Sequence, residues 1–292
     1  MLVGDVAFNP VEHDWQTWVG RIQTAADWIA PSRVAAWRAT LDHDATAVNE
    51  GDAVPPGFHW TLAPHVARES ELGPDGHARR DYRSFLPPVP LPRRLWAGSR
   101  VTFHQPLRVG DRIERSSVIA SVDEKRGRES PLVFVTVRHR YSGSSGVAIE
   151  EEQDLVYRDP PAAGAAGASS RNSAAGVPPA WQRTIHPTQT LLFRYSALTL
   201  NTHRIHYDRP YAVEVEGYAG LVVHGPLIAT LLLDLVSSRV PGTIGRFSFK
   251  ALRPTFDTSD FAVCGTAAGD GHYRLWSTDN QGDRAVEAEA WT

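Results

Sequence analysis

The chain has 292 residues, of which 42% are hydrophobic and 22% are charged, so it can form a sizeable core and is not a disordered protein. Its formal net charge of −3 gives no electrostatic reason to expect binding to nucleic acid or to a membrane. Cys264 is the only cysteine, which excludes an intrachain disulfide, and we find neither a signal-peptide pattern nor an apolar run long enough to span a bilayer; we therefore expect a cytoplasmic protein.

The N-terminal part of the sequence is typical of helices. Apolar residues recur at roughly helical spacing over residues 14–42, and Pro31 divides this stretch, so we expect two short helices. A further helical stretch is predicted over residues 55–71, because proline is well placed at a helix start. Residues 73–92 are rich in proline and glycine and are expected to form a loop.

Strand-like segments follow this loop. The clearest runs through Val133, Val135 and Val137, which alternate with polar residues as in a strand with one buried face. Turn-forming pairs and clusters of glycine and serine separate the segments. Four strands are therefore predicted, over residues 95–104, 112–122, 132–141 and 147–157.

The composition changes abruptly at residue 160, where alanine, glycine, serine and proline dominate up to residue 179. Such a segment has no apolar face to bury and is expected to be a linker. It divides the chain into an N-terminal domain (1–158), the linker (159–180) and a C-terminal domain (181–292). In the second domain the pattern leaves residues 190–200 open between strand and helix. Four further strands are predicted at 246–252, 261–266, 273–277 and 285–291.

Residues 225–239 form the most apolar segment, and a helix that is apolar on nearly every side must be buried. A buried helix followed by strands without intervening helices is typical of a curved antiparallel sheet wrapped around a central helix, the hot-dog fold. Each half has helices first and strands afterwards. We therefore predict an α+β double hot-dog, with two such sheets; two ordinary α+β domains with separate cores are the alternative.

Polar residues that can exchange protons crowd the segment immediately before this helix. N-T-H-R-I-H-Y-D-R-P-Y-A occupies residues 201–212, and G-L-V-V-H-G-P-L occupies residues 220–227. The helix starting at Gly225 brings unpaired backbone N–H groups into the interior, where they can stabilise a developing negative charge. A histidine such as His206 can exchange a proton near neutral pH. The two segments together predict an active site.

These segments resemble the MaoC-like (R)-specific enoyl-CoA hydratases, whose pattern is D-x-N-P-L/I-H-x-D with a downstream H-G at the start of the hot-dog helix. The resemblance implies that His206 is the catalytic histidine and that Gly225 supplies the N–H that holds the thioester oxygen. Asn201 falls on the family's aspartate and His203 on its asparagine. Because Asn201 cannot accept a proton, either His206 is the sole acid/base or another carboxylate substitutes, Asp208 being the nearest in sequence.

The strings F-R-Y-S-A-L-T at 193–199 and L-P-P-V-P-L-P-R-R-L-W-A-G at 86–98 resemble, within that family, the branch of mesaconyl-C4-CoA (3-methylfumaryl-CoA) and itaconyl-CoA hydratases. The resemblance implies reversible addition of water to an unsaturated dicarboxylic CoA thioester, giving citramalyl-CoA. No cofactor and no metal ion are expected, CoA being part of the substrate, and a homodimer is expected. Candidate substrate-binding residues are Arg93, Arg94, Arg204, Val223 and His224.

Three other functions remain open on the residues alone. A hot-dog thioesterase could use the same helix N-terminus, although it usually needs a carboxylate base. A non-catalytic acyl-CoA-binding module is the second. A metal hydrolase is the third, because His203, His206, Asp208 and His224 cluster in the sequence, although the H-E-x-x-H pattern is absent.

Overall fold

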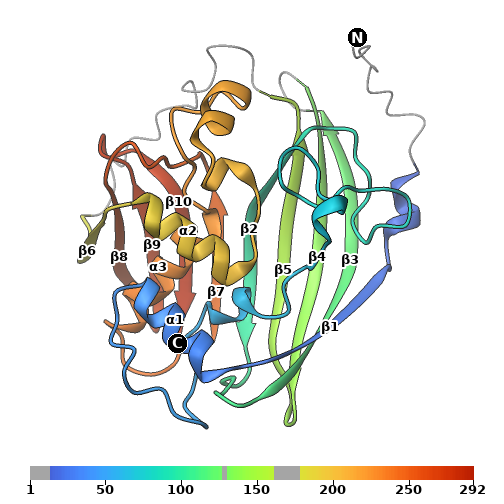
Figure 1. Ribbon diagram of the computed structural model, residues 1–292. Helices are drawn as coiled ribbons and strands as arrows, with labels where there is room; N and C mark the ends of the chain where they lie inside the picture. Colours follow the sequence, from blue (N-terminus) through green and yellow to red (C-terminus); the bar gives the residue numbers. More distant parts are fainter. Residues whose placement is uncertain (1–13, 127–129, 161–177) are drawn as a thin grey trace.

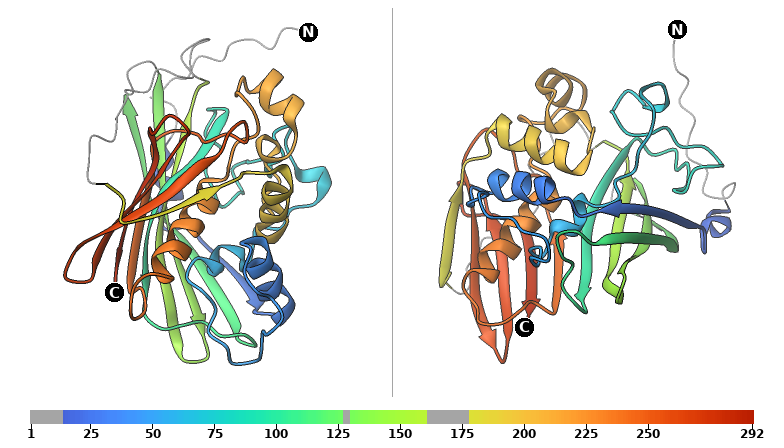
Figure 2. Two further views of the ribbon diagram at one scale, coloured as in Figure 1. Left: turned by 90° about the vertical axis from the view of Figure 1, so that its left-hand side faces the viewer. Right: turned by 60° about the horizontal axis from the view of Figure 1, so that its bottom comes forward.

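The computed structural model describes residues 14–126, 130–160 and 178–292. These residues form one ten-stranded antiparallel sheet, in the order β1-β3-β4-β5-β2-β7-β10-β9-β8-β6, with the helices against one face (Figures 1 and 2). The N-terminal half supplies β1 (Ile22–Trp28), β2 (Arg93–Phe103), β3 (Arg112–Arg126), β4 (Pro131–Gly143) and β5 (Gly146–Arg158). The C-terminal half supplies β6 (Trp181–Ile185), β7 (Arg246–Ala251), β8 (Phe261–Gly269), β9 (His272–Thr278) and β10 (Arg284–Trp291).

The two halves join edge to edge through β2 and β7. Gly98 lies opposite Lys250 and Thr102 opposite Arg246, in antiparallel register. A side chain at position 98 would place its Cβ 2.3 Å from the carbonyl oxygen of Phe249, so glycine is required for this close approach. The sheets of the two halves are therefore continuous, and the start of β2 is fixed beside the C-terminal half.

The predicted apolar helix is α3 (Gly225–Ser237), which packs against β2 and β7–β10 on the concave face of the sheet. Pro226 occupies its first turn, where the missing N–H costs nothing. Ten of its thirteen residues are buried, so the prediction of a helix buried all round is confirmed. Its polar Asp234 faces outward and pairs with Arg183 at 2.7 Å. No helix of the described chain is long and apolar enough to cross a membrane.

Two further helices cover the same face. α2 (Gln189–Thr199) settles the segment that the sequence left open, and the Thr188 side chain caps it by accepting a hydrogen bond from the Leu191 N–H at 3.1 Å. α1 (Pro31–Thr40) lies against α2 and corresponds to the second helix predicted within residues 14–42. Leu200 ends α2 with a φ of 50°, which turns the chain towards the cavity described below.

The first predicted helix within residues 14–42 is wrong. Residues Trp15–Trp18 form a short 3-10 turn, and the chain then becomes β1, which pairs with β3 at the edge of the sheet. The helical spacing was misleading because Trp15 and Trp18 pack into a local cluster under the N-terminal strands, whereas Ile22 is 67% exposed. Gly20, with a φ of 84°, breaks the chain direction between the two elements.

The helix predicted over residues 55–71 is also wrong. Only the 3-10 turns Phe58–Thr61 and Glu69–Glu71 form, so among the described residues the N-terminal half has no counterpart of α3. All four residues of the first turn are buried, and Trp60 donates a hydrogen bond to the buried Glu151 at 3.1 Å. Pro64 follows Ala63, whose φ is 48°, and this prevents the turn from extending. Most of the predicted linker, residues 161–177, lies outside the described chain.

Candidate active site

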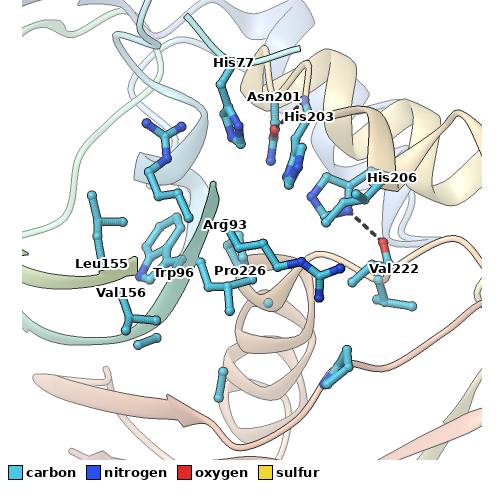
Figure 3. A pocket seen from close by; sticks show the side chains of 18 of the residues that line it. His77, Arg93, Trp96, Leu155, Val156, Asn201, His203, His206, Val222 and Pro226 are labelled. Atoms are coloured by element: carbon cyan, nitrogen blue, oxygen red, sulfur yellow. Dashed lines mark hydrogen bonds between the residues drawn. The ribbon is translucent and has the colours of Figure 1, made fainter. Parts of the chain in front are cut away.

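A cavity of about 1560 Å³ lies between the two halves, beside the N-terminus of α3 (Figure 3). Its wall combines the segment that follows α2, the first turn of α3, the start of β2, the end of β5 and the loop that contains His77. Arg93 and Arg94 of β2 line the cavity, and so do five other residues that the sequence predicted for catalysis or binding. They are Asn201, His203, His206, Val223 and Gly225.

His206 is held in one orientation at the end of the 3-10 turn Arg204–His206. Its Nδ1 lies 2.7 Å from the carbonyl oxygen of Val222, to which it can only donate, so the Nε2 carries the lone pair. The side chain is 7% exposed, and burial lowers the pKa of His206 to about 4. His206 is therefore neutral at physiological pH and able to accept a hydrogen bond or a proton in the cavity.

His224 lies behind His206 rather than at the surface of the cavity. The two rings are stacked, with centroids 3.7 Å apart and planes 16° apart. The Nε2 of His224 is 2.8 Å from the Ser196 hydroxyl on α2, and the side chain is fully buried. Burial keeps the pKa of His224 well below its usual value. It is thus placed to fix the His206 ring, and it is not among the residues that line the cavity.

Gly225 opens α3 at the cavity wall. Since Pro226 has no N–H and the Ile228 N–H donates to the His224 carbonyl at 3.1 Å, the Gly225 N–H is the first-turn donor nearest the start of the helix. No acceptor among the described residues takes it. An unpaired N–H at a helix N-terminus is suited to hold an oxygen that gains negative charge.

Asn201 and His203 lie side by side in the same wall (Figure 3). The Asn201 Oδ1 accepts a hydrogen bond from the His203 backbone N–H at 3.1 Å, which leaves the amide NH₂ as a donor for a bound molecule. The His203 ring meets the His206 ring edge-on, with centroids 5.6 Å apart. Burial, together with the neighbouring His77 and His206, lowers the pKa of His203, so this ring is also neutral.

His77 is a site residue that sequence reasoning missed. It reaches the cavity from the loop after Gly73, and its ring lies against that of His203 with centroids 4.2 Å apart. Its Nδ1 is 2.8 Å from the Asp75 Oδ2, and its backbone N–H donates to the Asp75 Oδ1 at 3.0 Å. Burial lowers the pKa of His77 to about 4, with a contribution from Arg94, against the opposite influence of Asp75. Only the string Asp75-Gly76-His77 could have drawn attention to it.

The structure separates the three candidate arginines. The Arg93 Nε is 3.0 Å from the Glu216 carboxylate, and its guanidinium also lies over the Tyr218 ring. Arg204 does not line the cavity: its Nη2 is 2.7 Å from Asp208 and its Nη1 donates to the Pro74 carbonyl at 2.8 Å.

Arg94 lines the cavity, and Tyr157 and Asp75 lie close enough to influence its guanidinium. No ion pair within the described chain involves its guanidinium, which is the arrangement expected of a receptor for an anionic ligand.

Asp208, the nearest carboxylate in the sequence, does not face the cavity. It accepts hydrogen bonds from the Arg204 guanidinium at 2.7 and 2.9 Å and from the Tyr211 N–H at 3.2 Å, so it holds the local structure and does not replace the missing carboxylate in the cavity. The set of His203, His206, Asp208 and His224 therefore does not converge on one point. Among the described residues, Asp75, His77 and His203 bring ligand atoms within 4.8 Å of one another. A hydrogen bond joins Asp75 to His77, and the rings of His77 and His203 lie against each other.

Known proteins share both the sequence and the architecture. Residues 57–257 match the family described as hydroxyacyl-thioester dehydratase type 2. The mesaconyl-C4-CoA hydratase of Chloroflexus aurantiacus is 44% identical over 257 residues, which are 88% of this chain and 90% of that protein. A MaoC-like dehydratase from Phytophthora capsici aligns with a TM-score of 0.67 at 14% identity, covering 94% of this chain and 96% of its own. A Mycobacterium tuberculosis protein with a double hotdog fold aligns with a TM-score of 0.56 at 12% identity, covering 94% and 96%. The double hot-dog prediction is confirmed.

Proposed function

The chain belongs to the hydroxyacyl-thioester dehydratase type 2 family, and from that membership we propose that it adds water reversibly to an α,β-unsaturated CoA thioester whose acyl group carries a second carboxylate. The family makes it an enzyme of the hydratase and dehydratase class, as the sequence resemblance predicted. The proposed reaction is the hydration of mesaconyl-C4-CoA, or of itaconyl-CoA, to citramalyl-CoA. Support for the acyl group comes from the relative at 44% identity and from the charge of the cavity.

The observation that carries the proposal is the position of a neutral His206 and an unpaired Gly225 N–H in the wall of one cavity. Hydration of an enoyl thioester needs a donor for the carbonyl oxygen, which becomes an enolate oxygen as water attacks Cβ. It also needs a group that orients the water by accepting a hydrogen bond from it. The Gly225 N–H and the His206 Nε2 meet these two needs without any rearrangement of protonation.

Asn201 supplies a third contact. Its amide NH₂ has no acceptor within the described chain, and the residue lines the cavity. An NH₂ donor can hold the lone pair of a water whose hydrogen points at the His206 Nε2. We assign Asn201 to water orientation, because an amide cannot exchange a proton at neutral pH.

Arg94 is assigned to the free carboxylate of the acyl group. Arg93 is neutralised by Glu216 and Arg204 by Asp208, whereas Arg94 keeps its charge available in the cavity beside His77 and His203. A guanidinium binds a carboxylate through two parallel hydrogen bonds, which fixes the orientation of the ligand as well as its charge. A monocarboxylic acyl chain would leave this cation unpaired, and that is the physical basis for a dicarboxylic preference.

The test is a substrate screen of the wild-type protein and of Arg94→Met with mesaconyl-C4-CoA, itaconyl-CoA and crotonyl-CoA, following hydration and thiol release separately. We expect wild-type hydration to favour a dicarboxylic ester. Arg94→Met should lower kcat/KM for that ester about 10- to 100-fold, the usual effect of losing a charge-assisted hydrogen bond, and leave crotonyl-CoA almost unchanged.

Arg253→Met is the matched control. Arg253 lines the same cavity, but Asp279 at 3.0 Å and Asp283 at 3.1 Å already neutralise it. Its removal should not change the ratio between dicarboxylic and monocarboxylic esters. Thiol release without hydration would identify a thioesterase, and binding without either reaction would identify a non-catalytic module; either result overturns the proposed function.

A further inference from the structure

Hydration moves a proton from water to Cα, and the site contains a group for this proton that the family pattern does not include. We propose that His77, held by Asp75, is a second catalytic residue, which carries the proton while the adduct forms. The inference rests on the proposed hydration. The resemblance places an aspartate at position 201, where this chain has Asn201. In this chain the carboxylate is that of Asp75 in the N-terminal half, and it acts through His77.

The loop that carries His77 is attached to the catalytic segment by direct hydrogen bonds. The Thr202 hydroxyl donates to the Gly76 carbonyl at 2.6 Å, and the Arg204 N–H donates to the Asp75 carbonyl at 2.9 Å. Gly76 has a φ of 87°, and a Cβ there would lie 1.9 Å from the Thr202 carbonyl oxygen. Only glycine permits this contact, and the contact fixes the position of His77 in the cavity wall.

The site contains four histidine rings, and they differ in the group that could stabilise each ring if it were protonated. The four are His77, His203, His206 and His224. His206 donates to a backbone carbonyl, and His224 meets the hydroxyl of Ser196. No carboxylate of the described residues forms an ion pair with either ring or with His203. His77 alone among the four faces a carboxylate, at 2.8 Å. An imidazolium formed in this cavity is therefore best stabilised on His77, in the arrangement that orients and supports a general base.

The charged groups around His77 come from several elements. Arg80 lies on its own loop, Arg94 on β2, and His203 and His206 on the segment after α2. The two guanidiniums disfavour protonation of His77, and Asp75 favours it. At rest His77 is thus neutral, with its Nδ1–H donated to Asp75 and its Nε2 able to accept a proton.

His77 and His206 are neutral before and after the hydration step. The water oxygen bonds to Cβ while one water O–H bond breaks, and that proton passes to the His77 Nε2. The π electrons move to the thioester oxygen, where the Gly225 N–H holds the charge. The enolate then takes the proton from His77 to form the Cα–H bond, and His77 returns to its neutral state. His206 accepts a hydrogen bond from the hydrogen that stays on the hydroxyl group.

The test uses His77→Ala in the full-length protein with mesaconyl-C4-CoA and with added imidazole. We expect kcat to fall about 10²- to 10⁴-fold, the range for loss of a positioned base, while KM changes little. Added imidazole, or methylimidazoles of different basicity, should restore part of the rate in proportion to their basicity. His104→Ala is the matched control, because His104 is also held by a carboxylate, that of Glu150 at 2.9 Å, but does not line the cavity, so its loss should leave kcat unchanged.

Asp75→Asn keeps the shape of the loop and tests the positioning residue separately. It should lower kcat and move the acid limb of the pH profile to lower pH by about 1 unit, since Asp75 favours protonation of His77; Asp75→Glu should restore part of kcat.

Wild-type turnover in His77→Ala overturns the inference, as does a loss of rate that no imidazole restores. Loss of wild-type activity with a chelator and its recovery with Zn²⁺ would make Asp75, His77 and His203 a metal site, and would also overturn it. A wild-type protein that hydrates no ester contradicts the proposed function instead.

Discussion

Replacing Gly76 by alanine tests whether loop docking places the chemistry. The φ of 87° costs a residue with a Cβ about 1–2 kcal/mol. The new Cβ would also lie 1.9 Å from the Thr202 carbonyl oxygen, so the loop must move away. Movement breaks the hydrogen bonds from Thr202 to Gly76 and from Arg204 to Asp75, each contributing about 0.5–1.5 kcal/mol. The expected loss of stability is about 2–5 kcal/mol, limited by how far the loop can detach without unfolding the sheet.

The kinetic effect should exceed the effect on stability. A displacement of His77 by about 1 Å is enough to lower kcat about 100-fold. The assays are thermal unfolding and steady-state hydration of mesaconyl-C4-CoA. Gly51→Ala is the matched control, because Gly51 has a φ of 85° but nothing within 4 Å of the added Cβ. If Gly76→Ala and Gly51→Ala have the same unfolding temperature and the same kcat, the docking argument is refuted.

Two further predictions concern the buried histidines. His206→Gln should lower kcat about 10²- to 10⁴-fold with little change in KM, because glutamine cannot reproduce the imidazole Nε2 acceptor that the Val222 carbonyl fixes; unchanged turnover would remove His206 from the mechanism. The second prediction is acid sensitivity. His77 and His206 have folded pKa values of about 4, against about 6.5 in the unfolded chain, so the unfolded state binds more protons between these values. Stability should therefore fall as the pH drops from about 6.5 to about 4, by about 1.4 kcal/mol per pH unit for each histidine titrating in the unfolded state alone. Urea unfolding at about pH 7 and about pH 5 measures this, and His206→Gln should reduce the difference; equal midpoints in the wild type would contradict the burial argument.

The elements that the sequence predicted correctly are those whose signal is local. α3 is apolar on nearly every side, and β4 alternates between buried and partly exposed residues, so each pattern specifies its own burial. β1 shows why an edge strand was missed. None of its seven residues is fully buried, and its pairing with β3 depends on backbone hydrogen bonds that leave no trace in side-chain type. The buried turn Phe58–Thr61 was taken as helical because burial on all sides does not distinguish a turn from a helix.

The site follows the same division. Asn201, His203 and His206 are close in the sequence and the structure places all three in the cavity wall with Gly225, as the motif predicted. Their catalytic roles stay predictions, as does the homodimer. His77 could not be predicted, because 126 residues separate Gly76 from its partner Thr202 and the contact forms only when the loop docks. The sequence also could not predict which of the three candidate arginines lacks an ion pair. That depends on where the fold places the carboxylates of Glu216 and Asp208, which pair with Arg93 and Arg204.

The joined sheet explains how two unlike halves can form one site. Pairing of β2 with β7 fixes the start of β2 beside the first turn of α3: a Cβ on Gly225 would lie 3.9 Å from the Trp96 carbonyl oxygen. Two identical hot-dog subunits would have to repeat the same residues on both sides of this junction. In a single chain the halves can differ, so the C-terminal half keeps the His206 motif while the N-terminal half contributes Arg94 and His77 to the same cavity. In the part of the N-terminal half that the structure describes, no helix corresponds to α3, which is consistent with this division because the turn at Phe58–Thr61 takes less space than a second α3 would.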